Sequence, residues 1–434
     1  MTTDHPPPPP GTRTEPPRLT GSPFDSDTFT SATFVTVGRG PYLAVASVWL
    51  ITRVGMVLLL LRDTLGIGGV GREVELYRYW YAQFTQGTFP PGDATWQYPP
   101  GAGLVIMSPG LLPWLTYVQA FTVLTLLADA VVTAALARAD SARLTHGAWI
   151  WVCGLPLLLH LPLARLDVQS TALAVLALLA LGARPAAAHR LGGALAGLGA
   201  MVKVWPALAL IGTPRGRTTR EAWSAALVTA LALLATLALF FSDSLGFLRQ
   251  QGGRGIQIES LGGTALALAG AGGLWPGRVE FRYGSFEYVG PYVSTLGHLA
   301  LLLTVLAFGW LLLWRVRAHR WTAATPYDAA LTAVLLFTVT SRVISPQYMI
   351  WLLGLAAVCL TSRNTVMRPV ALLLLPAAAL SSLAYPMLYD HVVAGTTEGL
   401  TVMVLRNGLL LAATALAAHR LWTSTVTGPP EETA

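Results

Sequence analysis

The chain has 434 residues, of which 54% are hydrophobic and only 11% are charged, and its mean hydropathy is +0.57. A soluble globular protein carries about 25% charged residues, so this composition excludes a soluble enzyme, a disordered scaffold and a fibre. The formal net charge is +7, and the basic residues lie in short arginine-rich segments between long apolar runs, as is typical of cytoplasmic loops in membrane proteins. The sequence therefore predicts an all-α polytopic membrane protein.

The chain is expected to begin with a cytoplasmic tail. Prolines occupy positions 6–10 and disfavour helix, so we predict that residues 1–40 are disordered. The segment 42–61 is apolar and has the length, about 20 residues, that crosses the hydrocarbon core of a bilayer. We therefore expect the loop that follows, 62–100, on the extracytoplasmic side.

This first loop contains residues at the spacing of one helix face, i, i+3, i+4, i+7 and i+11. They are Glu73, Leu76, Tyr77, Trp80 and Phe84. The pattern predicts an amphipathic helix on the membrane surface with an acidic residue at its head. Its aromatic residues are interpreted as anchors at the membrane interface or, alternatively, as a platform for a sugar.

The arginine clusters divide the rest of the chain into pairs of apolar segments. The pairs are 148–163 with 168–183, 191–202 with 204–213, 222–241 with 291–314, 327–341 with 347–361, and 369–388 with 399–418. The stretch 101–138 has room for one crossing, since roughly 38 residues make at most ~57 Å of helix and three crossings need ~90 Å. The sequence thus predicts about 12 transmembrane helices within residues 41–421, with both termini cytoplasmic. A second extracytoplasmic loop is expected at 242–290 and a disordered cytoplasmic tail at 422–434.

Lys203 is the only lysine in the chain and has apolar neighbours on both sides. The pair of segments around it is too short for two full spans, so we predict a shallow hairpin of half-helices buried in protein. An ionisable group at that depth costs at least ~2.5 kcal/mol unless it is paired or hydrated. Lys203 is therefore expected either to form a structural ion pair or to bind the phosphate of a head group. Arg53 and Asp129, inside predicted spans, are expected to be paired structurally.

Five motifs in chain order resemble those of glycosyltransferase family 87, which comprises GT-C membrane glycosyltransferases. The motifs are Glu73-x-x-x-Tyr77, Trp96-Gln-Tyr-Pro-Pro100, Lys203-x-x-Pro206, Gln257-Ile-Glu-Ser260 and Ser345-Pro-Gln-Tyr348. The resemblance covers roughly residues 42–420. It implies a GT-C fold and an inverting transfer of a sugar, mannose in the actinobacterial-type members, from a polyprenyl-phosphate donor. The acceptor would be a hydroxyl of a glycolipid or glycan at the extracytoplasmic face of the cell membrane.

The resemblance also implies a catalytic base and a phosphate site. Family members have an Asp four residues before the loop tyrosine, and Glu73 occupies that position here. We expect Glu73 to take the proton of the acceptor hydroxyl, with Asp93 as the alternative. Cations are needed where the phosphate leaves, because negative charge accumulates there, and Lys203, Arg342 and Arg254 are the candidates.

Further substrate contacts are expected from polar and aromatic residues of the outer loops. They are Glu75, Tyr77, Gln97, Tyr98, Asp167, Gln169, Gln257, Ser260, Gln347 and Tyr348. For Asp167 an ion pair with Arg165 is an equal alternative. The histidines are scattered and Glu73 with Glu75 is insufficient for a metal, so we expect no metal or other cofactor. The basic residues do not form one face, so we expect no nucleic-acid partner.

Two other classes of protein stay open at this point. About twelve crossings and charges within the membrane are also traits of secondary transporters, although the sequence has no internal repeat and its long loops fall on one side. A non-catalytic scaffold or flippase accessory is the second alternative. It predicts that the polar loop residues can be changed without consequence.

Overall fold

The computed structural model describes residues 1–2, 40–62, 68–139, 145–183, 185–250 and 254–427. The tail predicted at 1–40 therefore lies almost entirely outside the described residues, as does 428–434 of the predicted C-terminal tail. The prediction of disorder is wrong at 422–427, because Trp422 ends the last α-helix and Thr423–Thr427 continue it as a π-helical turn.

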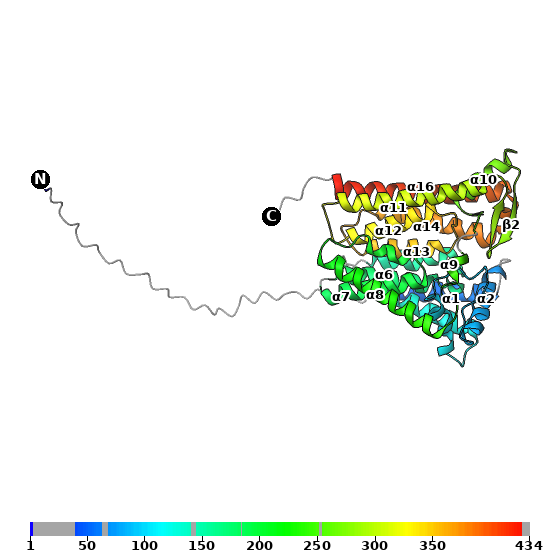
Figure 1. Cartoon of the computed structure of the whole chain (residues 1–434), viewed down its shortest axis with the longest axis horizontal. Coiled ribbons are helices and arrows are strands. Elements are labelled where there is room, and N and C mark those ends of the chain that lie inside the picture. The colour runs from blue at the N-terminus through cyan, green and yellow to red at the C-terminus, as the bar shows by residue number, and fades with distance from the viewer. Residues whose placement is uncertain (3–39, 63–67, 140–144, 184, 251–253, 428–434) are drawn as a thin grey trace. The chain divides into compact units, whose positions relative to one another are not determined.

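Six helical stretches in the described part of the chain are long and apolar enough to cross a membrane. They are α1 (Gly40–Arg62), α4 (Tyr117–Ala139), α8 (Arg217–Phe240), α11 (Val293–Arg317), α14 (Arg368–Ser382) with the turn Leu383–Met387, and α16 (Thr397–Trp422) with Thr423–Thr427. Shorter helices pack among them (Figure 1): α3 (Ala102–Met107), α5 (His146–Gly154), α6 (Asp167–Leu181), α7 (Ala186–Val202), α12 (Thr325–Thr340) and α13 (Tyr348–Leu360). The protein is a polytopic membrane protein, and the count of twelve crossings stays a prediction.

The helices divide into a buried centre and an outer layer. All side chains from 349 to 359 in α13 are buried, as are those from 325 to 335 in α12. A helix that is apolar on every face belongs inside the protein. In contrast α1, α8 and α11 bury only a few side chains each, so their remaining apolar surface is available to lipid.

The span predicted at 148–163 is shorter than expected. Helix α5 ends at Gly154, and two 3-10 turns follow, Leu155–Leu158 and Leu161–Ala164. Each turn contains a proline near its start, Pro156 and Pro162, which removes a backbone donor and stops the α-helix. The chain consequently reaches α6 through these two short turns.

Arg53 and Asp129 form an ion pair inside the bundle, as predicted. Arg53 Nε donates to Asp129 Oδ2 at 2.8 Å, and the indoles of Trp49 and Trp151 each donate to the same carboxylate at 2.6 Å. This network joins α1, α4 and α5. Removing one partner of such a buried pair typically costs 3–5 kcal/mol, so the role of both residues is structural.

Helix α7 lies tightly against α8 because its contact face carries glycine. A side chain at Gly193 would collide with the backbone of Ala222, and one at Gly197 with that of Ala226. Small residues one turn apart allow such close approach in membrane helices. This packing fixes the end of α7, where Lys203 follows.

The loop at 242–290 contains a sheet, so the all-α prediction is wrong there. Strands β1 (Ile256–Gln257), β2 (Arg278–Arg282) and β3 (Ser285–Val289) form an antiparallel sheet of order β1-β3-β2. Tyr283 and Gly284 join β2 to β3 with positive φ angles of 51° and 76°, the conformation of a type I′ hairpin. The same loop contains two short helices, α9 (Phe247–Gln250) and α10 (Leu261–Ala271).

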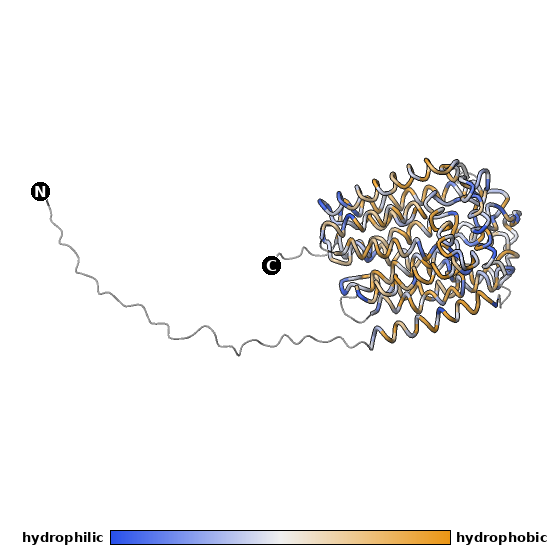
Figure 2. Tube along the Cα trace, turned by 90° about the horizontal axis from the view of Figure 1, so that it is seen from below, coloured by the Kyte–Doolittle hydropathy of each residue, from blue (hydrophilic) through white to orange (hydrophobic). Residues whose placement is uncertain are grey.

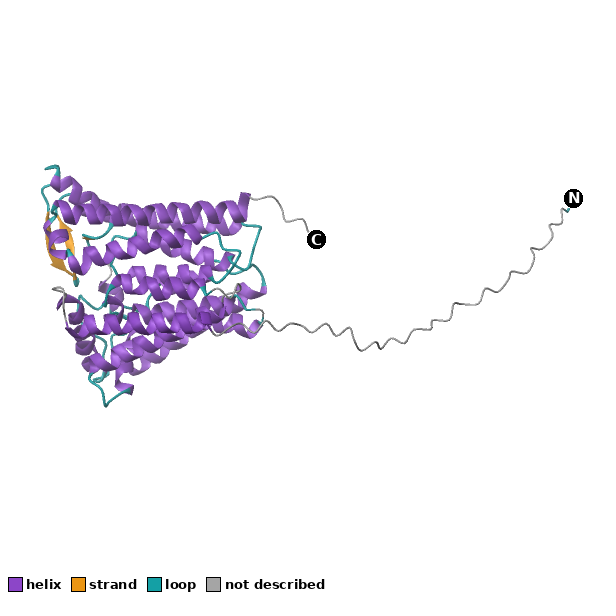
Figure 3. Cartoon of the chain, turned by 180° about the vertical axis from the view of Figure 1, so that it is seen from behind, coloured by secondary structure: helices purple, strands orange, loops and turns teal. Residues whose placement is uncertain are grey.

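The sheet marks one end of the helical bundle (Figure 3), and the last turn of α16 lies at the other end. Polar residues gather toward the two ends, whereas apolar residues dominate the middle (Figure 2). Because α11 starts directly after the sheet, its basic last turn, with Arg315 and Arg317, lies at the end away from the sheet.

The helix predicted in the first loop is present as α2 (Gly68–Phe84), but its aromatic face is buried in protein. Tyr77, Trp80 and Phe84 belong to a core cluster with Phe121 of α4. The prediction of a helix anchored on the membrane surface by these residues is therefore wrong. Helices α3 and α4 cover that face, and hydrophobic spacing alone does not distinguish a protein neighbour from lipid.

Candidate active site

A cavity of about 550 Å³ is lined in part by the β2–β3 hairpin, and it therefore lies toward the sheet end of the bundle. Its other walls come from α2, the segment before α3, the segment before α6, the residues after α7, the segment 254–259, α12, the start of α13 with the segment before it, and the turn after α14. Six side chains of Asp, Glu, Lys or Arg type line it: Arg72, Glu73, Arg165, Lys203, Arg254 and Glu259. The cavity thus collects groups that are far apart in the sequence.

Glu73 is placed in the cavity by α2 and is held there by an arginine. Its Oε2 lies 2.8 Å from a terminal nitrogen of Arg165, and its side chain is 22% exposed. Burial alone would lower the pKa of Arg165, but the Glu73 carboxylate and neighbouring tyrosines raise the pKa well above its ordinary value. The arginine is therefore charged at all physiological pH values and fixes the direction of the Glu73 carboxylate.

Lys203, the residue that directly follows α7, lines the same cavity. Its Nζ donates to Asp167 Oδ1 at 2.6 Å, and Trp351 Nε1 donates to that oxygen at the same distance. The ammonium also lies 5.1 Å from the Trp351 ring centroid and 5.3 Å from that of Tyr98. Since an ammonium has three N–H donors, the bond to Asp167 leaves donors for a ligand.

These contacts settle two expectations about pairing. The partner predicted for Lys203 is present, and it is Asp167. The alternative in which Asp167 pairs with Arg165 is wrong, because Arg165 pairs with Glu73. Asp167 does not itself line the cavity and acts on it through the position of Lys203.

Of the two arginines expected at the phosphate, the structure places one in the cavity. Arg254 lines it and donates to the carbonyl of Tyr283 at 3.2 Å, with Glu287 3.8 Å away. Arg342 does not line the cavity. Its guanidinium donates to the carbonyl of Arg254 at 2.9 Å, so it supports the segment that carries Arg254.

The residues expected to contact substrate fall into two groups. Those that line the cavity are Gln97, Tyr98, Gln257, Gln347 and Tyr348. Besides Asp167, those that do not are Glu75, Tyr77, Gln169 and Ser260, together with the alternative base Asp93.

The second group has structural contacts instead. Asp93 accepts hydrogen bonds from Trp80 Nε1 at 2.9 Å and from the backbone of Thr95 at 2.8 Å, which shapes the loop before α3. Glu75 pairs with Arg78 on the exposed face of α2. The remaining three are buried or committed elsewhere: Tyr77 lies in the core, Gln169 donates to Thr125 at 2.6 Å, and Ser260 caps α10.

Several cavity residues were not predicted. Glu259 is buried and accepts a hydrogen bond from Gln257 Nε2 at 2.9 Å, and burial raises its pKa to about 7. Its position inside the motif at 257–260 was the available signal. Trp351 and Trp205 were also missed. The Trp351 ring stacks on Trp205 and on the predicted Tyr348, with centroid distances of 5.2 Å and 3.9 Å.

Two segments that line the cavity are bound by hydrogen bonds from α16. Arg406 is fully buried and donates to the carbonyls of Glu259 at 2.9 Å and Ile344 at 3.2 Å. The neighbouring Asn407 donates to Thr264 Oγ1 of α10 at 2.7 Å. One buried arginine thus fixes the two segments that contribute Glu259 and Gln347 to the cavity.

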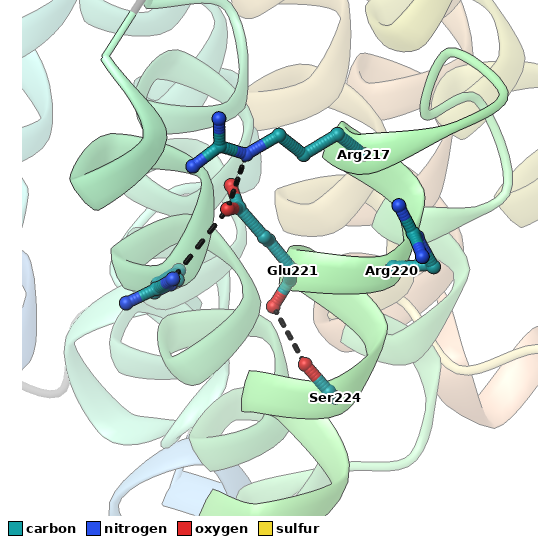
Figure 4. Close-up of a pocket in the computed structure, with 5 residues that line it drawn as sticks. Arg217, Arg220, Glu221 and Ser224 are labelled. Atoms are coloured by element: carbon teal, nitrogen blue, oxygen red, sulfur yellow. Dashed lines mark hydrogen bonds and ion pairs between the residues drawn. The ribbon is translucent and has the colours of Figure 1, made fainter.

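A second hollow lies at the starts of α7 and α8 (Figure 4), where Arg190, Arg217, Arg220, Glu221 and Ser224 line it. Arg217 Nε donates to Glu221 at 2.8 Å, and Arg190 lies 3.5 Å from the same carboxylate oxygen. Arg190 and Arg217 are largely exposed. The hollow lacks aromatic walls and is interpreted as a solvated helix end.

Within the described ranges, no cluster of three or more His, Cys, Asp or Glu side chains could hold a metal ion. The bundle and its charged, aromatic cavity define a polytopic membrane protein with a site for a polar ligand. The model of glycosyltransferase family 87 matches residues 96–346, more than half of the sequence. The chain belongs to glycosyltransferase family 87, as its motifs indicated, and this assignment favours a glycosyltransferase over the transporter and the scaffold.

Among solved structures, the chain is similar to the crystal structure of ArnT from Cupriavidus metallidurans bound to undecaprenyl phosphate. The TM-score is 0.46 and the sequence identity 14%, over 88% of this chain and 78% of that chain. No curated protein matches the sequence.

Proposed function

We propose that this glycosyltransferase transfers mannose from a polyprenyl-phosphate donor to a hydroxyl of a glycolipid or glycan acceptor, with inversion at the anomeric carbon. The observation that supports this most is that Glu73 and Lys203 line one cavity. Such a reaction needs a carboxylate for the incoming hydroxyl and a cation for the departing phosphate.

In the proposed reaction the acceptor oxygen attacks the anomeric carbon while its proton passes to Glu73. The bond between that carbon and the phosphate oxygen breaks, and its electron pair stays with the phosphate. The charge on the phosphate therefore grows as the charge on Glu73 disappears. Lys203 and Arg254 would stabilise the phosphate. When Glu73 is protonated, the positive charge of Arg165 is no longer compensated by a carboxylate.

The cavity also suits a lipid-linked donor. Val204 and Phe337 line it beside the charged residues, and Val204 is 64% exposed. An apolar chain could therefore extend from the cavity into the bilayer while its phosphate stays at Lys203.

We place the active site on the extracytoplasmic side. The basic ends of α8 and α11 lie away from the sheet, and cytoplasmic loops retain Lys and Arg. The placement is tested by single cysteines at Gln97 and Arg217 in intact cells. A membrane-impermeant thiol reagent should label the first and not the second, and the reverse pattern would contradict the placement.

The reaction is tested with purified protein in detergent. Polyprenyl-phosphate mannose, polyprenyl-phosphate glucose and a soluble nucleotide-linked mannose are each offered with a panel of lipid and glycan acceptors. We expect transfer from the mannosyl lipid, with the opposite anomeric configuration in the product. Transfer from the nucleotide sugar alone, or from none of the lipid donors, would overturn the proposal.

Ser260 does not line the cavity, and we propose that its role is structural. Its Oγ accepts from the backbone nitrogen of Gly263 at 2.9 Å and caps α10. Ser260→Ala is expected to lower the free energy of unfolding by about 1 kcal/mol, the usual value of a lost cap, and to leave the KM for the donor unchanged. Thermal unfolding in detergent and transfer kinetics measure the two effects, and a raised KM without a stability change would restore Ser260 to the site.

A further inference from the structure

One wall of the cavity presents a carboxyl oxygen without a partner. Glu259 lies between β1 and α10, is 2% exposed and lines the cavity. Its Oε2 accepts from Gln257, whereas its Oε1 has no hydrogen-bond partner among the described residues. Buried polar atoms are rarely left unpaired, because each costs the full desolvation of the group. The oxygen is thus suited to a donor supplied by a ligand.

A second unpaired acceptor lies on a neighbouring segment. The Oε1 of Gln347 is also buried without a partner in the described part of the chain, and Gln347 lines the cavity. The two segments are adjacent, since Gln257 Nε2 lies 3.5 Å from Ser345 Oγ and donates to Glu259. Arg406 binds the backbone of both segments, so the two acceptors are held in fixed positions.

The chemistry of this wall favours a hydroxyl group. A phosphate would be repelled by the Glu259 carboxylate and has cations available at Lys203 and Arg254. A hydroxyl can donate to a carboxyl or amide oxygen. The stacked rings of Tyr348, Trp351 and Trp205 line the same cavity and offer flat surfaces for the apolar face of a sugar ring.

We propose that Glu259 and Gln347 form a subsite for the hydroxyls of a bound sugar, in which Glu259 Oε1 accepts a hydrogen bond from one hydroxyl. This subsite rests on the proposed function of the cavity. The hydroxyl belongs to the sugar of the lipid donor or to a sugar of the acceptor, and the chemistry of recognition is the same for both.

The variant Glu259→Gln tests the subsite. Its amide oxygen can still accept from Gln257, while an NH2 group replaces the unpaired acceptor. Two lipids are titrated against the purified protein: polyprenyl-phosphate mannose and polyprenyl phosphate without a sugar. If the donor sugar occupies the subsite, the variant should bind the mannosyl lipid about 10-fold or more weakly, as expected for a lost hydrogen bond to an ionisable group, and bind the sugarless lipid unchanged.

If the acceptor sugar occupies the subsite, the affinities for both lipids stay the same and the KM for the acceptor rises by a similar factor. Gln347→Leu should act in the same direction with a smaller effect. Glu280→Gln is the matched control, because Glu280 pairs with Arg278 and Arg282 on β2 and does not line the cavity. It should change none of these quantities.

The outcomes separate the subsite from the proposed function. If the wild-type protein binds neither lipid, the proposed function is wrong and the subsite with it. If it binds both lipids, and Glu259→Gln changes neither the sugar-dependent affinity nor the KM for the acceptor, the subsite alone is wrong. A fall in kcat without either change would also overturn it, because it would assign Glu259 to proton transfer.

Discussion

Replacing Glu73 by Gln is expected to lower the rate of sugar transfer by about 10² to 10⁴-fold, the range for loss of a general base. Glutamine has nearly the same size and its amide oxygen can still accept from Arg165, so the cavity keeps its shape. It cannot take the proton of the acceptor hydroxyl. The initial rate of transfer from polyprenyl-phosphate mannose by the purified variant measures the effect.

Glu75→Gln is the matched control for this experiment. Glu75 lies two residues away on α2, and its carboxylate pairs with Arg78 on the exposed face. Exposed ion pairs of this kind contribute little, so the rate should stay close to that of the wild-type protein. Full activity in Glu73→Gln together with an inactive Asp93→Asn would make Asp93 the base.

The second large effect is expected for Lys203→Met, with a fall in transfer of about 10² to 10³-fold, the range measured when one charge-stabilising donor is removed from an active site. This variant also leaves Asp167 buried without its cation, which typically costs 3–5 kcal/mol. A lower melting temperature in detergent should therefore accompany the loss of activity. The single variant alone does not separate the two causes.

The double variant Lys203→Met with Asp167→Asn makes that separation. It removes both charges, and the neutral amide can still accept from Trp351 Nε1. We expect the melting temperature to recover toward the wild-type value while transfer stays low. Recovery of transfer along with stability would show that Lys203 serves only as the structural partner of Asp167.

Much of the helical framework follows from the sequence because hydropathy is a local property. The apolar runs at 42–61, 222–241, 291–314 and 399–418 coincide with α1, α8, α11 and α16. What surrounds a helix is not local. The aromatic face of α2 has the spacing of a membrane anchor, but it packs on α4 because segments distant in the sequence fold over it.

The sheet was missed although its signal is present. In 278–288 polar and apolar residues alternate on both sides of Tyr283 and Gly284, as two strands joined by a tight turn require. The whole of 242–290 was nevertheless interpreted as one loop. In the observed strand register, residue 280 of β2 lies opposite residue 287 of β3, and Tyr283 and Phe286 of this hairpin line the cavity.

The sequence indicated several residues that lie together in the structure, but it did not indicate their ion-pair partners. Glu73, Lys203 and Arg254 were expected at the site from the family resemblance and from their expected side of the membrane, and they line one cavity. The pairing of Glu73 with Arg165 and of Asp167 with Lys203 joins residues 92 and 36 positions apart. Such pairs depend on helix packing, which local patterns in one sequence do not reveal. The hydrogen bonds of the buried Arg406 to the carbonyls of Glu259 and Ile344 likewise have no local signal in the sequence.

In the proposed reaction the carboxylate of Glu73 and the ammonium of Lys203 act on one lipid-linked sugar. The most direct measurement is an electron cryo-microscopy structure of the Glu73→Gln variant with polyprenyl-phosphate mannose. We expect the donor phosphate within about 3 Å of Lys203 Nζ, the distance of a charge-assisted hydrogen bond, and the sugar between Lys203 and the side chain at position 73. A head group bound elsewhere, for example at the arginines around Glu221 at the starts of α7 and α8, with this cavity empty, would show that Glu73 and Lys203 do not act on the donor.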